Sequence, residues 1–167
     1  MAIYLSILLL GLATALQSSV MPQIRVLGGQ PDLVFLLVLA WSVNTRLQDG
    51  LIWAFVGGIM NNLLSAAPLG VSSMSMILLV FVIDAIRRQV YSIGLPLLVL
   101  LVIFGSLFHQ LMVMMILSLV GHEIAFLDSL SYVVAPTIAY NLVVIWPVYW
   151  FIRRMQRRLA GGRPALM

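Results

Sequence analysis

The chain lacks two residue types that soluble proteins use freely. Its 167 residues include no cysteine and no lysine, so all nine basic residues are arginine. The absence of cysteine excludes disulfides, thiolate metal sites and cysteine nucleophiles. Only 8% of the residues are charged and 63% are hydrophobic, whereas soluble domains have about 25% charged residues. This composition excludes a water-soluble fold and indicates a membrane protein.

Six apolar segments follow one another along the chain. They are expected at about residues 2–21, 32–46, 50–66, 70–87, 94–120 and 129–152. About 20 apolar residues cross a bilayer as a helix, so the length allows six spans and no sizeable domain outside the membrane. We therefore predict an all-α, polytopic membrane protein. A six-helix bundle would occupy residues 1–152 and a basic cytoplasmic tail residues 153–167.

Two details of these segments require a choice. The first has no basic residue before it, so we interpret it as a retained helix rather than a signal peptide. The second has an apolar core of 11 residues, LVFLLVLAWSV, which is about 16 Å of helix and roughly half the hydrocarbon thickness. A re-entrant hairpin of the second and third segments would place Arg46, Gln48 and Asp49 in the bilayer, which is costly. We therefore predict two short spans, completed by flanking residues or by local thinning of the membrane.

The arginines predict the orientation. With both termini in the cytoplasm, only Arg25 lies outside, and eight arginines lie inside: Arg46, Arg87, Arg88, Arg153, Arg154, Arg157, Arg158 and Arg163. The basic tail either anchors this topology or binds anionic lipid or an acidic partner. No interleaving of basic and aromatic residues indicates nucleic-acid binding.

Polar residues within the segments gather toward the predicted outer side. They are Gln17, Ser18, Ser19, Asn61, Asn62, Ser72, Ser73, Ser75, His109, Gln110, Tyr140 and Asn141. Because unpaired polar groups are costly in lipid, these side chains are expected to face a protein interior or a cavity. We predict a partly polar recess that opens outward. The alternative is a set of interhelical hydrogen bonds that only holds the bundle together.

The ionisable residues predict local pairs rather than chemistry. We expect His109 to be neutral and hydrogen-bonded, because no carboxylate is expected at its depth to form a proton relay. Asp84 precedes Arg87 by three residues and Arg88 by four, which predicts an interfacial ion pair. Arg46 and Asp49 are expected to pair at the inner turn or to touch a neighbour.

Two further patterns concern packing and catalysis. Gly11 with Ala15, and Ala54 with Gly58, have the spacing of small residues that permits close helix contact. The five acidic residues form no acid and base pair with a nucleophile, and no glycine-rich phosphate loop is present. We therefore predict a protein that is not an enzyme and needs no cofactor or metal.

Residues 31–88 contain a Pro-Asp opening of a short helix, a small charged inner turn, and a helix with the ending G-x-x-x-N-x-x-S-x-x-P-L-G. The residues of this pattern are Pro31, Asp32, Arg46, Asp49, Gly50, Gly58, Ser65, Pro68, Leu69 and Gly70. In this pattern the segment resembles the MreD family of rod shape-determining membrane proteins, in which the helix ends in G-x-x-x-D-x-x-S/A-x-x-P-L-G. Asn62 stands where the family usually has aspartate, so a hydrogen bond rather than a charge is expected there.

The resemblance implies a function and a set of partners. It implies a non-enzymatic scaffold of the bacterial elongasome, in the cytoplasmic membrane, that supports side-wall peptidoglycan synthesis and rod cell shape. The implied partners are an MreC-like single-span protein, then RodA, its transpeptidase and MreB, together with membrane lipids. The implied fold is similar to the S-components of energy-coupling-factor (ECF) transporters.

An alternative function is a small-molecule-binding subunit of such a transporter. Fold alone does not separate the two functions, because function resides in the site. A lipid flippase is a third class, but the segments lack the charges expected for handling a phosphate. In either main case, we expect these residues to bind the partner or support the architecture: Asp32, Arg46, Asp49, Gly58, Asn61, Asn62, Pro68, Gly70, Asp84, His109 and Asn141.

Overall fold

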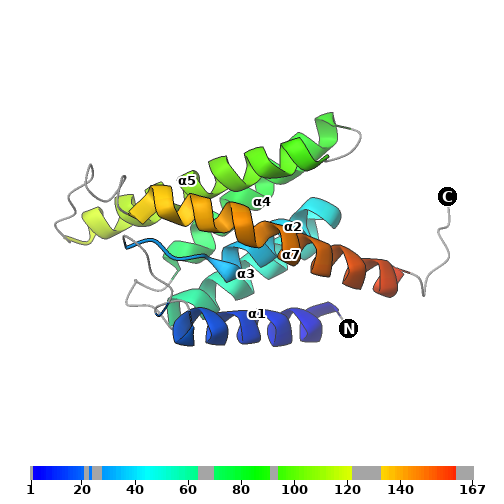
Figure 1. Cartoon of the computed structure of the whole chain (residues 1–167), viewed down its shortest axis with the longest axis horizontal. Coiled ribbons are helices and arrows are strands. Elements are labelled where there is room, and N and C mark those ends of the chain that lie inside the picture. The colour runs from blue at the N-terminus through cyan, green and yellow to red at the C-terminus, as the bar shows by residue number, and fades with distance from the viewer. Residues whose placement is uncertain are drawn as a thin grey trace.

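The computed structural model describes residues 2–20, 23, 28–63, 70–90, 94–121 and 133–160. Within these ranges the fold is all-α, with six helices and no strand: α1 (Ala2–Ser19), α2 (Leu33–Asn44), α3 (Leu47–Leu63), α4 (Val71–Gln89), α5 (Leu95–Leu119) and α7 (Ala135–Ala160). Successive helices run in alternating directions, and the start of α1 and the end of α7 lie at the same end of the molecule (Figure 1). The all-α class and the six helices are confirmed.

The central helix is α2, which the other helices enclose. Residues 34–43 are all buried, and α2 contacts each of the other five helices. Its apolar side chains cover every side, which is the pattern of a fully buried helix. We expected a short span that is completed by flanking residues or that thins the bilayer locally. Instead, the 12 residues of α2, about 18 Å long, lie inside protein and need not match the membrane thickness.

Two outer helices are long and apolar enough to cross a bilayer. They are Leu95–Leu119 in α5 and the segment Ala135–Arg158 of α7. At 1.5 Å per residue each is about 36 Å long or more, which exceeds the hydrocarbon thickness of about 30 Å. Large apolar side chains on both helices, such as Phe104 and Val143, point away from the core and are exposed.

The last helix is longer than the sequence predicts. We expected it to end at residue 152 and a tail to follow, but α7 continues to Ala160 and includes Arg153, Arg154, Arg157 and Arg158. Arginine is a good helix former, and its charge is favourable near the C-terminal end of the helix dipole. The arginines of residues 153–158 therefore sit on a rigid helix.

A glycine allows α3 and α4 to approach each other very closely. A Cβ atom on Gly58 would overlap the backbone of Ser73, so the spacing of Ala54 and Gly58 does mark a helix contact. Gly11 differs, because a Cβ atom there would meet nothing within 4 Å. The pair Gly11 and Ala15 therefore does not mark a close contact at Gly11.

Candidate functional site: the buried polar network at the start of α2

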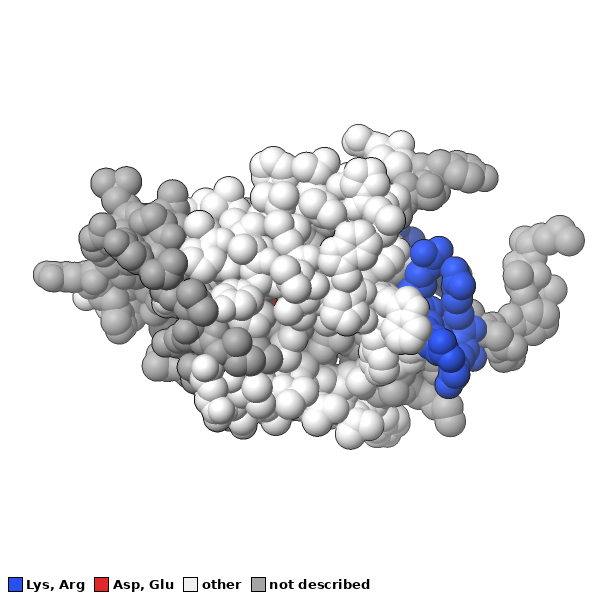
Figure 2. Space-filling model, viewed as in Figure 1, with Lys and Arg blue, Asp and Glu red and all other residues white. Residues whose placement is uncertain are grey.

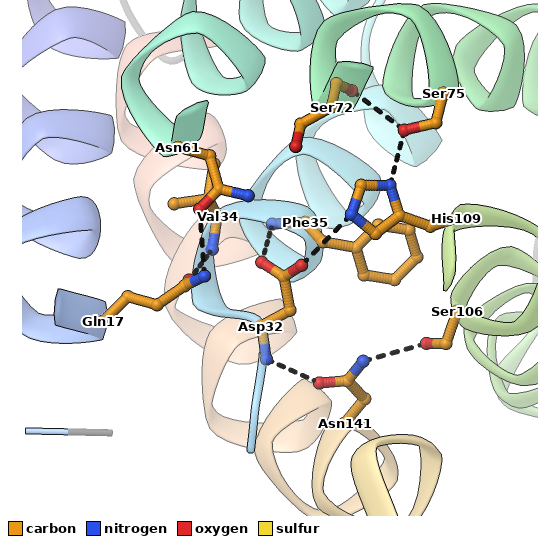
Figure 3. A network of polar contacts seen from close by, with 10 residues as sticks. All are labelled: Gln17, Asp32, Val34, Phe35, Asn61, Ser72, Ser75, Ser106, His109 and Asn141. Carbon is orange, nitrogen blue, oxygen red and sulfur yellow. Dashed lines mark hydrogen bonds and ion pairs between the residues drawn. The ribbon is translucent and has the colours of Figure 1, made fainter. Parts of the chain in front are cut away.

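Asp32 begins the central helix and is bonded on three sides. Its Oδ1 accepts a hydrogen bond from the Phe35 backbone N–H at 3.0 Å, which makes it the N-cap of α2. The Asp32 backbone N–H donates to Asn141 Oδ1 on α7 at 2.9 Å. The Val34 N–H donates to Gln17 Oε1 on α1 at 3.1 Å. The first backbone donors of the buried helix thus find partners on other helices (Figure 3).

The second carboxylate oxygen of Asp32 faces His109. Asp32 Oδ2 lies 3.4 Å from His109 Nε2, and His109 Nδ1 lies 2.6 Å from Ser75 Oγ. The Phe35 ring stacks on the imidazole, with 5.4 Å between centroids. All three polar residues are buried, with 8% of Asp32, 5% of His109 and 1% of Ser75 exposed.

The expectation that no carboxylate lies at the depth of His109 is therefore wrong. The physical reason is the shortness of α2. A helix of 12 residues that reaches the inner turn starts well inside the bundle, so its N-cap residue lies at mid-bundle rather than at the membrane surface. Asp32 consequently meets His109 from the middle of α5.

The geometry supports a structural role for this triplet. Both ring nitrogens of His109 have an oxygen partner, Asp32 Oδ2 at Nε2 and Ser75 Oγ at Nδ1, so the imidazole joins α2, α4 and α5. Aspartate, histidine and serine also occur together in hydrolases, where the hydroxyl must reach a substrate. Ser75 is buried and its Oγ also lies 2.9 Å from the Ser72 carbonyl oxygen. This hydroxyl holds α4 to α5 and is not placed as a nucleophile.

Two further bonds extend the network across the bundle. Asn141 Nδ2 donates to Ser106 Oγ at 2.9 Å, which joins α7 to α5. Gln17 Nε2 donates to Asn61 Oδ1 at 3.1 Å, which joins α1 to α3. Together with Asp32, His109 and Ser75, these residues link all six helices around the start of α2. We predicted an open recess here, but in the described residues these polar side chains bond to one another.

Three other predicted residues belong to α3 or to the segment between α3 and α4: Asn62, Pro68 and Gly70. Asn62 is buried in α3. Gly70 precedes α4 with φ of +98°, a left-handed conformation that glycine adopts without strain. Pro68 lies outside the described residues, as do Ser65 and Leu69.

The predicted ion pairs lie elsewhere and only one forms. Asp84 Oδ2 accepts from Arg88 Nε at 2.9 Å, as expected. Arg46 and Asp49 do not form an ion pair within the described part of the chain; the Arg46 carbonyl accepts from the Gly50 N–H at 3.1 Å. Arg46 is exposed at the turn between α2 and α3, where water solvates its charge.

The carbonyl groups at the other end of α2 accept hydrogen bonds from Arg87, which was expected to pair with Asp84, and from Gln156, which no sequence pattern indicated. Arg87 donates to the carbonyl oxygens of Ser42, at 3.3 Å, and Thr45. Gln156 Nε2 donates to the Trp41 carbonyl at 3.4 Å. The last carbonyls of a helix need such partners when no water reaches them. A signal in the sequence is the short length of the second apolar segment, because both ends of a short buried helix need hydrogen-bond partners from other helices.

The fold and this network define a class of protein, a helical membrane bundle built around a short, buried central helix. The model of the family "rod shape-determining protein MreD" matches residues 1–159. The chain belongs to this family, and the resemblance seen in residues 31–88 is confirmed. It is therefore a membrane protein with a role in rod shape determination. Comparisons with curated proteins and with solved structures found no match.

Proposed function

We propose that this chain is a non-enzymatic scaffold of the elongasome that binds an MreC-like single-span protein and so supports side-wall peptidoglycan synthesis. The observation that carries the proposal is that the polar side chains at the start of α2 bond to one another rather than line a cavity. Asn141 and Ser75, for example, are each 1% exposed. Polar groups engaged in this way hold helices in fixed positions, which suits a scaffold.

The proposal includes a surface for the partner's membrane helix. An apolar groove of about 570 Å³ lies between α4 and α5, and Val82, Phe104 and Leu107 are among its lining residues. It lies against α5, one of the two candidate spans. Helices associate in lipid through packing in such grooves. We propose that the single span of the MreC-like protein packs here.

A substitution that fills the groove tests this proposal. In Leu107→Trp, the larger side chain would occupy the groove, and we expect about tenfold less MreC-like protein to co-purify from native membranes in mild detergent. Leu12→Trp is the matched control, because Leu12 is exposed on α1, away from the groove. Equal recovery of the partner with both variants would show that the groove is not the binding surface.

We propose a multi-pass topology in the bacterial cytoplasmic membrane, with both termini inside and a fold similar to ECF transporter S-components. RodA, its transpeptidase and MreB are proposed neighbours. Mass spectrometry of the co-purified material separates scaffold from transporter subunit. Recovery of a single-span protein with a large extracytoplasmic domain supports the scaffold, whereas recovery of an ATPase module with a small organic ligand supports the alternative.

A further inference from the structure

Four arginines form a patch on the last turns of α7. Arg153, Arg154, Arg157 and Arg158 are all exposed, and they are the blue surface at the end of the molecule in Figure 2. At 3.6 residues per turn, they cover an arc of about 140° of the helix circumference. Trp150 lies one turn earlier within the same arc, and Arg154 sits 5.3 Å from the centroid of its ring. We call these four arginines and Trp150 the arginine patch.

The charge of the arginine patch is not balanced within the described residues. There, the arginine that pairs with a carboxylate is Arg88, with Asp84, and no carboxylate lies within 4.0 Å of the patch. Arg153 and Arg157 are four residues apart, as are Arg154 and Arg158, and like charges at this spacing repel. An anion from outside the chain would remove this repulsion.

The patch has the right depth for lipid headgroups. It follows directly after the apolar part of a candidate membrane span, and Trp146 and Trp150 are exposed just before it, as is typical of the membrane interface. The headgroup layer is about 5–8 Å thick on each side. Residues 153 to 158 rise by about 8 Å along the helix, so the patch covers this layer.

The surface at the patch has room for both the phosphate and the acyl chain of a lipid. A hollow of about 430 Å³ is lined by Trp150 and the four arginines. A second one, of about 370 Å³, lies beside it and is lined by Trp150, Phe151, Arg154, Met155 and Arg158. Guanidinium groups bind phosphate oxygens in pairs, while Phe151 and Met155 offer apolar surface to an acyl chain.

We propose that the arginine patch is a binding site for anionic phospholipid. The lipid phosphate contacts the guanidinium groups, and the start of its acyl chain lies along Trp150, Phe151 and Met155. The lipid is held on one face of one helix. In the orientation proposed above, this face is on the cytoplasmic side, so the bound lipid belongs to the cytoplasmic leaflet. This inference depends on the arginine patch and not on the partner groove.

The test compares two double variants of the full chain, purified in a neutral detergent. Each protein is mixed with equal amounts of phosphatidylglycerol and phosphatidylcholine that have the same acyl chains, and native mass spectrometry counts the lipids retained. We expect wild type to retain phosphatidylglycerol, and R154Q/R158Q to bind it about 30-fold more weakly, the change expected for the loss of two basic residues near an anionic lipid. R46Q/R88Q loses the same charge outside the patch and should bind as wild type does.

Three outcomes would overturn the proposal. Equal retention of the two lipids by wild type would show that the patch does not select anionic lipid. Equal loss in the two double variants would assign the effect to net charge rather than to the patch. Binding of a glutamate-rich peptide to the patch with no retention of phosphatidylglycerol would assign it to a protein partner. None of these outcomes depends on recovery of an MreC-like protein, so the scaffold proposal stands or fails separately.

Discussion

At the scale of the residue, Asp32 combines two roles that are usually separate. One carboxylate oxygen caps α2 through the Phe35 N–H, and the other faces His109 on α5 at 3.4 Å. A carboxylate at a helix N-terminus also interacts favourably with the helix dipole. In an interior without water these contacts replace hydration, which explains why an acidic residue is found at mid-bundle.

The comparison of Asp32→Ala with Asp32→Asn separates these roles. Alanine removes the cap, worth about 1 kcal/mol, and leaves His109 Nε2 without its partner, at a cost of about 1–3 kcal/mol. We expect Asp32→Ala to lower the free energy of unfolding by about 2–4 kcal/mol. Asparagine caps helices as well as aspartate, so its effect should be less than half as large. Unfolding by denaturant in detergent measures both, and equal losses would show that the cap contributes little.

At the scale of the element, α2 is stabilised from both ends. At its start, Asn141 and Gln17 accept hydrogen bonds from backbone N–H groups, and at its end Arg87 and Gln156 donate hydrogen bonds to carbonyl oxygens. An isolated helix of 12 residues is marginal, so α2 depends on its neighbours for stability. Those neighbours in turn pack on its apolar side chains.

Close packing of α3 on α4 gives the prediction at this scale. In Gly58→Ala the added Cβ atom would overlap the Ser73 backbone, so the two helices must move apart at a cost of about 1–3 kcal/mol of unfolding free energy. Gly11→Ala is the matched control. It adds a methyl group where nothing lies within 4 Å, and alanine favours helix by up to about 1 kcal/mol. If thermal unfolding of the two variants in detergent is the same, the contact at Gly58 is not restrictive.

At the scale of the whole molecule, the four described arginines of α7 lie together at one end. On the face drawn in Figure 2 the arginines gather where α7 ends, and the remaining described surface is uncharged over most of its length. The start of α1 lies toward this same end (Figure 1). A bundle with this distribution is expected to insert with the basic end in the cytoplasm.

The absence of native cysteine makes this orientation directly measurable. Gln23 and Gln48 are both exposed; Gln23 follows the end of α1, and Gln48 lies in the first turn of α3, which begins at the opposite end of the bundle (Figure 1). We expect a membrane-impermeant maleimide to label Gln23→Cys in spheroplasts and to label Gln48→Cys only after the membrane is opened. The cysteine-free chain is the background control. The reverse pattern would show that the termini are outside.

The candidate site could be predicted in its members but not in its contacts. Asn61, His109 and Asn141 are recognisable in the sequence because polar residues in apolar segments need partners, whereas Asp32 is recognisable only through the family resemblance. The sequence does not reveal which residues pair, because the relative depth of two helices depends on where each begins. Ser106 was not predicted, because a lone serine in an apolar helix usually bonds to its own backbone.

The sequence by itself determined the class of this protein: an all-α membrane chain, its number of helices and its family. These follow from hydropathy, length and a few spaced motifs, which act locally along the chain. Only the tertiary structure decided that α2 is enclosed rather than lipid-facing, that Asp32 meets His109, and that the polar side chains at the start of α2 bond to one another rather than line an open recess. The physical reason is that lipid and protein interior are equally apolar, so composition does not distinguish a helix that faces one from a helix that faces the other.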